Sequence, residues 1–478
     1  MYEVRLPVRS PEDLAGIVHA HRLEELMGNI APRIRAGMAG HTIVNVNSTD
    51  AGGGVAEMLH VLLPFTLGAG VSASWYVMEG DPWFFEITKR IHNRLHGEAG
   101  DGGPLGSAEH EHVVEVVQRN SDMLRARVRL GDAVIIHDPQ PAGLAAELHD
   151  RGIPVVWRCH VGVDHRNEYT KQAWDFLRPF LADKVDAYVF TRRSYAPDWI
   201  PQDKLHVILP SIDPLSPKNQ YLGDETVIAA LSGSGIITGP GFGNATFRRQ
   251  DGSVSAFGIE AEVTRSGPVP SPDVPLIVQI SRWDPLKDMA GVMRAFAAEI
   301  APHTNAELAL VGPAVAAVSD DPEGQQVLQA VTEEWQELPD EVRNRVHLVS
   351  LPMTDPEANG ALVNAIQRHA AVVVQKSLAE GFGLTVTEAL YKGRPVVASN
   401  VGGIRDQIRD GVTGLLIDDP RDLRSFGDAV NSLIKDPELA ARLGAAAQAE
   451  AIDSFLPDSS LAKWHQVVLA AAVSRAEE

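Results

Sequence analysis

Residues 372–400 read VVVQKSLAEGFGLTVTEALYKGRPVVASN, a stretch with two short apolar segments, two acidic residues and a glycine-rich loop. The apolar run 371–374 predicts a buried strand, and the glycines within 380–383 predict a tight loop. A short helix over 384–391 and another strand over 396–399 are predicted to follow. The order strand, loop, helix, strand is typical of a parallel α/β sheet.

The loop and the helix after it carry groups suited to an anionic ligand with hydroxyl groups. Gly381 and Gly383 let a ligand approach the backbone, and the free amides of the turn that begins at Leu384 attract an anion. The carboxylates of Glu380 and Glu388 accept hydrogen bonds from sugar hydroxyls. In the alternative interpretation, Glu380 only caps the helix and Glu388 is a solvated surface residue. The glycines and the flanking strands favour a site for a donor sugar.

The composition limits the classes of partner. The chain has 478 residues and a formal net charge of −21 at pH 7, which argues against binding to nucleic acid or an anionic membrane. A nucleotide ligand would therefore need a local basic pocket. The single cysteine, Cys159, excludes an internal disulfide and fits a reducing cytosol. Since no segment resembles a signal core or a membrane span, we expect a cytoplasmic protein.

Residues 1–215 are predicted to form a first Rossmann-like domain, because short apolar strands alternate with helical stretches. The predicted strands cover residues 42–47, 74–78, 133–137, 155–159, 187–191 and 205–209. The glycine loop 48–54 joins the first strand to a helix, a geometry that brings phosphate close to the backbone. The three glycines taken alone slightly favour a plain tight turn.

Residues 216–275 are rich in Gly and Pro, and we predict that they form a linker with an insertion. Asp251-Gly252 within this segment predicts a hairpin. A second Rossmann-like domain is predicted over 276–455, and a last helix over 456–478 is expected to pack back on the first domain. The strands predicted in the second domain cover residues 276–281, 308–311, 346–350, 371–374, 396–399 and 414–417. The fold class is therefore α/β, with two doubly wound domains and the active site expected in the cleft between them.

Two cations follow the strand predicted over 276–281, at the end where parallel sheets bind ligands. Arg282 can donate two parallel hydrogen bonds and Lys287 can act as a point charge, so both could stabilise a diphosphate leaving group. Surface salt bridges are the alternative use of this pair. The triplet His110-Glu111-His112 fits a solvated helix face better than a zinc site, and we expect no metal.

The spacing of Glu380 and Glu388 around Gly-Phe-Gly resembles the donor motif of retaining glycosyltransferases with two Rossmann-like domains, the GT-B fold. The resemblance implies that Glu380 contacts the donor hexose and Glu388 the ribose of the nucleotide. The residues that it places against the sugar or the phosphates are Gly381, Phe382, Gly383 and Leu384.

A narrower resemblance, over residues 42–453, is to the glycosyltransferring trehalose synthases, which join nucleotide-activated glucose to free glucose. The runs that carry it lie at residues 47–57, 137–142, 157–160, 210–215, 320–324 and 380–389. The Gly-rich segment 232–264 departs from it. The resemblance implies a nucleotide sugar and glucose or trehalose as partners, and we expect a homodimer.

The resemblance also implies a retaining transfer without a protein nucleophile. We expect no divalent metal to be required, since Arg282 and Lys287 can supply the neutralising charge. His160 is expected to face the donor sugar, although a histidine at a strand end can equally be a packed structural residue. Arg282, Lys287 and the amides of Gly53 and Gly54 would hold the diphosphate, whose β-phosphate takes the proton of the acceptor.

The acceptor sugar is expected on the first-domain side, next to His137, Asp138, Gln140 and His160. Two other readings stay open. A trehalose phosphorylase of the same superfamily would pass the glucosyl group to phosphate, and a nucleotide-sugar epimerase or sensor would use the same fold for a different purpose.

Overall fold

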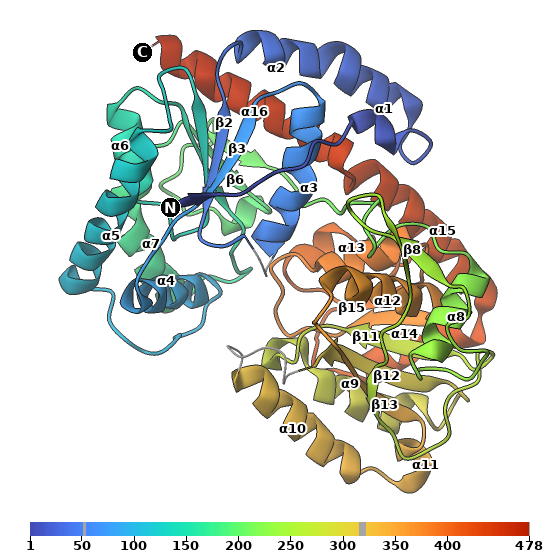
Figure 1. Cartoon of the computed structure of the whole chain (residues 1–478). Helices are drawn as coiled ribbons and strands as arrows, with labels where there is room; N and C mark the ends of the chain where they lie inside the picture. Colours follow the sequence, from blue (N-terminus) through green and yellow to red (C-terminus); the bar gives the residue numbers. More distant parts are fainter. Residues whose placement is uncertain (51–53, 315–321, 478) are drawn as a thin grey trace. The chain divides into compact units, whose positions relative to one another are not determined.

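The computed structural model describes residues 1–50, 54–314 and 322–477 (Figure 1). Within these residues the chain divides into two compact units. Unit 1 consists of Met1–Ile212 and Asp453–Glu478, and unit 2 consists of Asp213–Ile452. Each unit contains a largely parallel sheet with helices packed on it. The prediction of two doubly wound α/β domains is therefore confirmed.

The described part of unit 1 holds a seven-stranded sheet with the order β1-β3-β2-β4-β5-β6-β7, in which only β1 runs antiparallel to its neighbour. Its strands are β1 (Tyr2–Glu3), β2 (Ile43–Asn47), β3 (Ala73–Val77), β4 (Ala133–His137), β5 (Val155–Cys159), β6 (Ala187–Phe190) and β7 (Leu205–Val207). Its helices are α1 (Ala20–Glu25), α2 (Ala31–Gly37), α3 (Gly54–Gly68), α4 (Pro82–Leu95), α5 (Ser107–Arg125), α6 (Leu144–Asp150), α7 (Glu168–Leu181) and α16 (Pro457–Glu477).

The central strands β4 and β5 of unit 1 are buried along their whole length and mostly apolar, because helices cover both faces of the sheet. Trp157 of β5 packs edge-on against Trp174 of α7 on one of these faces. The last helix, α16, packs on α2 and α3, so the end of the chain returns to the domain in which it began (Figure 1).

The described part of unit 2 repeats this plan, with the strand order β10-β13-β12-β11-β14-β15-β16 and only β10 antiparallel. Its strands are β8 (Thr246–Arg248), β9 (Val254–Ala256), β10 (Glu262–Thr264), β11 (Leu276–Ile280), β12 (Glu307–Pro313), β13 (Val346–Leu351), β14 (Val372–Gln375), β15 (Val396–Ser399) and β16 (Leu415–Ile417). Its helices are α8 (Asp224–Gly233), α9 (Met289–Ala295), α10 (Pro322–Gln336), α11 (Asp340–Arg343), α12 (Pro356–His369), α13 (Leu384–Tyr391), α14 (Leu423–Lys435) and α15 (Pro437–Ser454), the last of which runs two residues past the unit boundary.

The predicted strands agree closely with those of the structure. The ranges 133–137, 155–159 and 396–399 match β4, β5 and β15 at both ends, and the other predicted ranges differ by one or two residues at an end. The edge strands β1 and β10 were not predicted, because two or three residues are too short to show an alternating pattern.

The segment 216–275, predicted as a linker, carries regular structure of its own within unit 2. Helix α8 packs on α12, and β8 pairs with β9 in the predicted hairpin around Asp251-Gly252. Strand β10 then joins the edge of the main sheet beside β13. The Gly-rich insertion therefore extends the second sheet.

Two expected absences can be compared with the described residues. No helix among them combines the length and apolar character that a membrane crossing needs, and none of their His, Cys, Asp and Glu side chains gather in threes as metal ligands would. The solvated face predicted for His110-Glu111-His112 is only partly correct. His110 stacks on Phe180, and His112 lies 2.8 Å from a carboxylate oxygen of Asp81.

One arginine anchors the hairpin, which leads to a first prediction. Arg249 donates to Asp355 at 3.1 Å and to Glu357 at 3.0 Å at the start of α12. We expect Arg249→Met to speed amide hydrogen exchange across β8 and β9 while the rest of unit 2 exchanges as before, as mass spectrometry would measure. Arg248→Met is the matched control, because among the described residues the side chain of Arg248 donates only to the carbonyl of Gly252 inside the hairpin. Equal exchange in both variants would show that the arginine does not anchor the hairpin.

Candidate active site

The loop 380–383 lies between β14 and α13, as predicted. Gly383 caps the helix with φ of 87°, a left-handed conformation that glycine adopts without strain. The amide of Val386 donates back to the carbonyl of Gly383, whereas the amides of Gly383, Leu384 and Thr385 have no acceptor among the described residues. Three backbone donors are therefore available to an anion at the start of α13.

A second glycine holds this loop in place from the side. The amide of Gly403 donates to the carbonyl of Gly381 at 3.1 Å, and a Cβ at Gly403 would lie 2.7 Å from that oxygen. Gln407 donates from Nε2 to the carbonyl of Phe382, and its Oε1 accepts from Thr387 of α13 at 2.7 Å. The loop is thus fixed by backbone contacts that leave no room for a side chain at Gly403.

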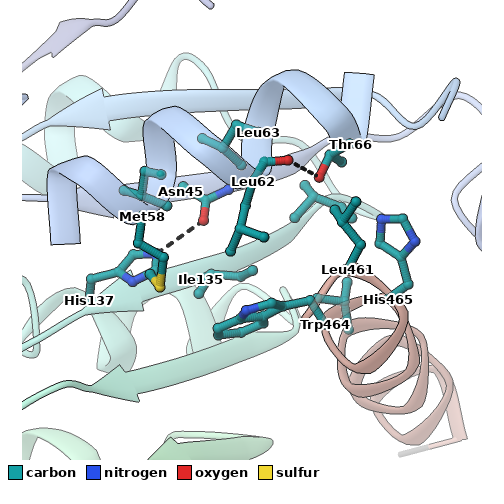
Figure 2. Close-up of a pocket in the computed structure, with 13 residues that line it drawn as sticks. Asn45, Met58, Leu62, Leu63, Thr66, Ile135, His137, Leu461, Trp464 and His465 are labelled. Atoms are coloured by element: carbon teal, nitrogen blue, oxygen red, sulfur yellow. Dashed lines mark hydrogen bonds between the residues drawn. The ribbon is translucent and has the colours of Figure 1, made fainter. Parts of the chain in front are cut away.

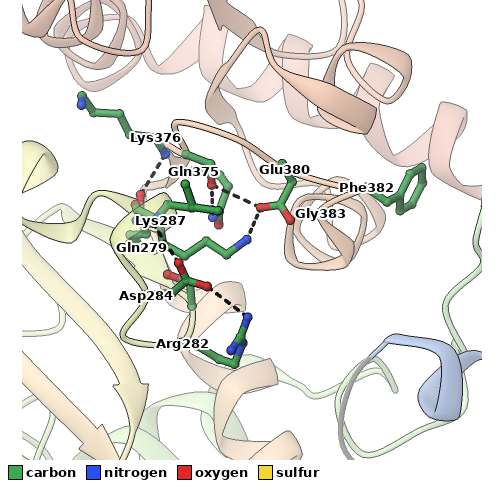
Figure 3. A network of polar contacts seen from close by, with 12 residues as sticks. Gln279, Arg282, Asp284, Lys287, Gln375, Lys376, Glu380, Phe382 and Gly383 are labelled. Atoms are coloured by element: carbon green, nitrogen blue, oxygen red, sulfur yellow. Dashed lines mark hydrogen bonds and ion pairs between the residues drawn. The ribbon is translucent and has the colours of Figure 1, made fainter. Parts of the chain in front are cut away.

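Lys287 and Glu380 meet at the carboxyl ends of β11 and β14, which confirms that these distant segments share one edge of the sheet. Lys287 Nζ lies 2.6 Å from Glu380 Oε2, and Ser377 donates to the same oxygen at 3.2 Å (Figure 3). Both side chains are largely buried. No described residue donates to Oε1 of Glu380, so one carboxylate oxygen remains for a ligand hydroxyl.

Arg282 does not join this cluster. Its side chain is 67% exposed and pairs with Asp284 at 3.0 Å (Figure 3). Trp283 between the two is buried against Gly312 and anchors the loop, which leaves Arg282 directed outward. Phe382 points away from the ion pair in the same view. Of the two predicted cations, the structure places only Lys287 beside Glu380.

Three residues that sequence analysis missed hold the two loops together. Gln279 of β11 donates from Nε2 to the carbonyl of Lys287 at 2.6 Å and accepts from the amide of Lys376 at 2.9 Å. Lys376 is buried and forms an ion pair with Asp288, which caps α9. The sequence signal for these contacts was weak: Gln279 interrupts one apolar strand segment, and Lys376 directly follows another.

Glu388 is fully buried on α13, so the alternative of a solvated surface residue is wrong. Its Oε1 lies 2.7 Å from Lys218 Nζ, but neither carboxylate oxygen accepts a well-aligned hydrogen bond from a described residue. Behind it, buried Lys392 donates to Asn219 at 2.9 Å and to Gln367 at 2.7 Å. The carboxylate therefore lies between two lysines with unused acceptor capacity.

In unit 1 the predicted acceptor residues cluster at the ends of β4 and β5. The amide of His160 donates to Asp138 Oδ1 at 2.7 Å, and His160 Nε2 lies 3.3 Å from His137 Nδ1. Asp138 has φ of 64°, a left-handed conformation that non-glycine residues seldom adopt, and its amide donates to the carbonyl of Arg158 at 2.7 Å. Such local strain often marks functional sites.

Burial dominates the electrostatics of this cluster. It lowers the pKa of His137 to about 3 and the pKa of His160 well below its ordinary value, so both imidazoles are neutral at pH 7. Burial also raises the pKa of Asp138 to about 7 and lowers the pKa of Arg158 to about 10, which leaves the guanidinium charged.

The remaining predicted residues of unit 1 are less informative. Gln140 follows Asp138 in the turn after β4 and is half-buried. Gly54 is the first residue of α3. Gly53 lies outside the described residues, so the expected diphosphate contact of the 48–54 loop stays a prediction.

Comparison with known proteins defines the class. The chain matches the families "Trehalose synthase, N-terminal domain" over residues 45–197 and "Glycosyl transferases group 1" over residues 262–450. A solved structure, "Trehalose-6-phosphate from E. coli bound with UDP-2-fluoro glucose", aligns with a TM-score of 0.66 at 12% identity and covers 89% of this chain and 99% of that one. The fold is that of a GT-B glycosyltransferase.

Two relatives narrow the class. Trehalose synthase from Pyrococcus horikoshii is 32% identical over 475 residues, which cover 98% of this chain and 99% of that protein. Trehalose synthase from Rubrobacter xylanophilus is 35% identical over 437 residues, which cover 90% of each chain. The chain therefore belongs to the trehalose synthase family of glycosyltransferases.

The contact of Gly403 with the loop gives a second prediction. In Gly403→Ala the new methyl group would force the backbone of Gly381 and Phe382 to shift, so that the amides at the start of α13 lose their alignment. We expect at least about tenfold weaker binding of a nucleoside diphosphate, measured by calorimetry, because the affected donors are charge-assisted. Gly258→Ala is the control, since its φ is not positive and no atom lies within 4 Å of its Cβ position. Equal affinity in both variants would show that Gly403 does not hold the loop.

Lys392 gives a third prediction, on the pH dependence of stability. Burial lowers its pKa from 10.5 to about 7. Between these values the unfolded chain binds a proton that the folded chain does not, so the free energy of unfolding rises with pH, by at most about 1.4 kcal/mol per pH unit. Urea unfolding across the lower half of this window should show the rise in the wild type and a weaker rise in Lys392→Met. A parallel rise in both would assign it to other groups.

Proposed function

We propose that this protein is a retaining glucosyltransferase that forms trehalose reversibly from a nucleoside-diphosphate glucose and free glucose. One observation carries the proposal. The ion pair of Lys287 with Glu380 lies in the same short segment as three backbone amides without acceptors, so a cation, a carboxylate oxygen and an anion-binding turn are available together. A sugar diphosphate needs all three.

On the donor side, Glu380 Oε1 accepts a hydrogen bond from a hexose hydroxyl, and the start of α13 binds the diphosphate. Lys287 neutralises the charge that grows on the leaving phosphate. Glu388 is assigned to the ribose, as the family resemblance implies, and its unused acceptor capacity supports this. Because the carboxylate is fully buried, ribose binding requires the side chain of Lys218 or its neighbours to shift.

On the acceptor side, we assign glucose to the cluster of His137, Asp138 and His160, with Gln140 beside it. Both imidazoles are neutral at pH 7, and burial raises the pKa of Asp138 to about 7, so the cluster carries little negative charge, which suits an uncharged sugar. During transfer, the bond from the glucosyl carbon to the β-phosphate oxygen breaks and a bond to the anomeric oxygen of the acceptor forms. The acceptor proton passes to the released nucleoside diphosphate, and the donor configuration is kept.

No protein nucleophile enters this scheme, and we propose that no metal is needed, since Lys287 and Arg282 can supply positive charge. Arg282 would have to turn from Asp284 toward the diphosphate, which its exposure permits. The nucleotide base and the homodimer expected from the sequence stay predictions.

Trehalose phosphorylase is the second candidate, because inorganic phosphate could also bind Lys287 and the amides of α13. A phosphorylase has no use for a carboxylate at a ribose, and a buried negative charge at Glu388 would weaken phosphate binding. An epimerase would need further acid and base groups in the site. A sensor would bind the nucleotide sugar without turnover.

The fourth prediction tests this choice directly. Trehalose and a nucleoside diphosphate should yield nucleotide-activated glucose and free glucose, with no metal added, and the reverse reaction should give the α,α-linked product by NMR. Glu380→Gln should lower kcat roughly 10- to 100-fold, because it weakens a hydrogen bond to a charged acceptor. The control Glu341→Gln changes an exposed carboxylate of α11, which precedes β13 and so lies away from the carboxyl ends of the strands.

Release of glucose 1-phosphate from trehalose and inorganic phosphate, with no reaction of the nucleoside diphosphate, would establish the phosphorylase instead. Binding of a nucleotide sugar without any turnover would establish the sensor.

A further inference from the structure

Four side chains in unit 1 form a continuous hydrogen-bonded chain. Arg158 Nε donates to His160 Nδ1 at 3.4 Å, His160 Nε2 lies 3.3 Å from His137 Nδ1, and His137 Nε2 lies 3.0 Å from Asn45 Oδ1. The chain runs across the neighbouring strands β5, β4 and β2. Asn45, His137 and Arg158 are buried, and His160 is half-buried.

The direction of every bond follows from the first donor. A guanidinium can only donate, so Nδ1 of His160 must accept and its proton must be on Nε2. That proton points to Nδ1 of His137, which must then accept, so that the proton of His137 is on Nε2 as well. Asn45 has to present its oxygen at the end. The neutral state that burial imposes on both imidazoles agrees with this order.

The first donor is held rigidly. Arg158 is fully buried and donates from Nη1 to the carbonyl of Ile208 at 2.6 Å and from Nη2 to Thr191 at 3.3 Å. The ring of Trp464, on α16, lies 5.8 Å from its guanidinium carbon. Arg158 therefore cannot turn its Nε away from His160 without breaking several contacts.

The last acceptor borders a small cavity. Asn45 and His137 line it together with Thr66 of α3 and with Trp464 and His465 of α16, and its volume is about 30 Å³ (Figure 2). Asn45 Nδ2 has no partner among the described residues, so this amide makes a single hydrogen bond, to His137. The cavity is large enough for one water molecule, which could bind the remaining N–H group.

A buried amide that keeps one bond and leaves a donor unpaired is costly in an otherwise apolar setting. Packing alone would favour an aliphatic residue at this position of β2, since the cavity is lined mainly by side chains such as Leu62 and Ile135. The bond to His137 is the contact that the amide supplies.

We propose that Asn45 is a positioning residue, which acts through His137 to keep the proton of His160 on Nε2 and to fix the plane of its ring for glucosyl transfer. The kinetic part of this proposal rests on the proposed function, because glucosyl transfer is the reaction that His160 serves. The hydrogen-bond order itself can be measured without turnover.

The test uses Asn45→Asp, which keeps the size and the acceptor but places a carboxylate beside His137. A carboxylate favours the doubly protonated imidazole, whose Nδ1–H would oppose Nε2–H of His160. We expect kcat for trehalose formation to fall at least about tenfold, whereas the KM for the nucleotide sugar, which binds unit 2, changes less than about twofold. Asn45→Leu, which removes the acceptor, should lower kcat in the same way.

Thr66→Val is the matched control. It removes a buried hydroxyl from the same cavity, and that hydroxyl donates to the carbonyl of Leu62 and takes no part in the chain. Its kcat should stay within about twofold of the wild type. A loss equal to that of Asn45→Asp would assign the effect to cavity packing and overturn the proposal.

Long-range proton–nitrogen NMR on protein labelled in its histidine rings reads the tautomers directly, with His137→Gln and His160→Gln used to assign the signals. The wild type should show both rings neutral and protonated at Nε2, and Asn45→Asp should change the His160 signals. A proton on Nδ1 of His160 in the wild type, or an unchanged kcat in Asn45→Asp, would overturn the proposal. A wild type that shows these tautomers but makes no trehalose would refute the proposed function alone.

Discussion

A buried amide and a backbone hydrogen bond from Leu378 to Leu286 link the two loops that carry the charged groups of unit 2. Gln279 joins the carbonyl of Lys287 to the amide of Lys376, so the loop after β11 and the loop after β14 are fixed to one another. Parallel strands bring both loops to one edge of the sheet, but they do not set the distance between a particular lysine and a particular carboxylate. The 2.6 Å contact of Lys287 with Glu380 depends on this bridge. An amide can make both bonds because it carries a donor and an acceptor, which no charged side chain does.

The two glutamates of the motif lie in different environments, although they stand on one short segment. Glu380 is held through one oxygen and keeps the other for a ligand, as expected of a group that contacts the reacting sugar. Glu388 is fully buried between Lys218 and Lys392. A buried carboxylate with poorly aligned partners is destabilising on its own, which agrees with the role in ligand binding that is proposed for Glu388.

Structural features that depend on periodic sequence patterns were predicted correctly, whereas features that depend on single side-chain contacts were not. Apolar strands such as β4 and β5 were located to the residue because helices cover both of their faces. The meeting of Lys287 with Glu380 followed from topology. The outward turn of Arg282 could not be predicted, because it depends on Trp283 packing against Gly312, a contact between the loop after β11 and the neighbouring strand β12. Asn45 was missed for a similar reason, since one amide in an apolar strand gives no pattern until its partner is known.

The two units treat charge in opposite ways, and this division fits the two substrates of the proposed reaction. Unit 2 offers a lysine and backbone donors, which a diphosphate requires, in a chain whose net charge is −21 at pH 7. The cluster in unit 1 also contains a cation, Arg158. This side chain is buried and donates to the hydrogen-bonded series of His160, His137 and Asn45. Burial holds both of these imidazoles neutral at pH 7. In the proposed reaction, neutral imidazoles suit an uncharged acceptor sugar, whereas the lysine and the backbone donors of unit 2 suit a diphosphate.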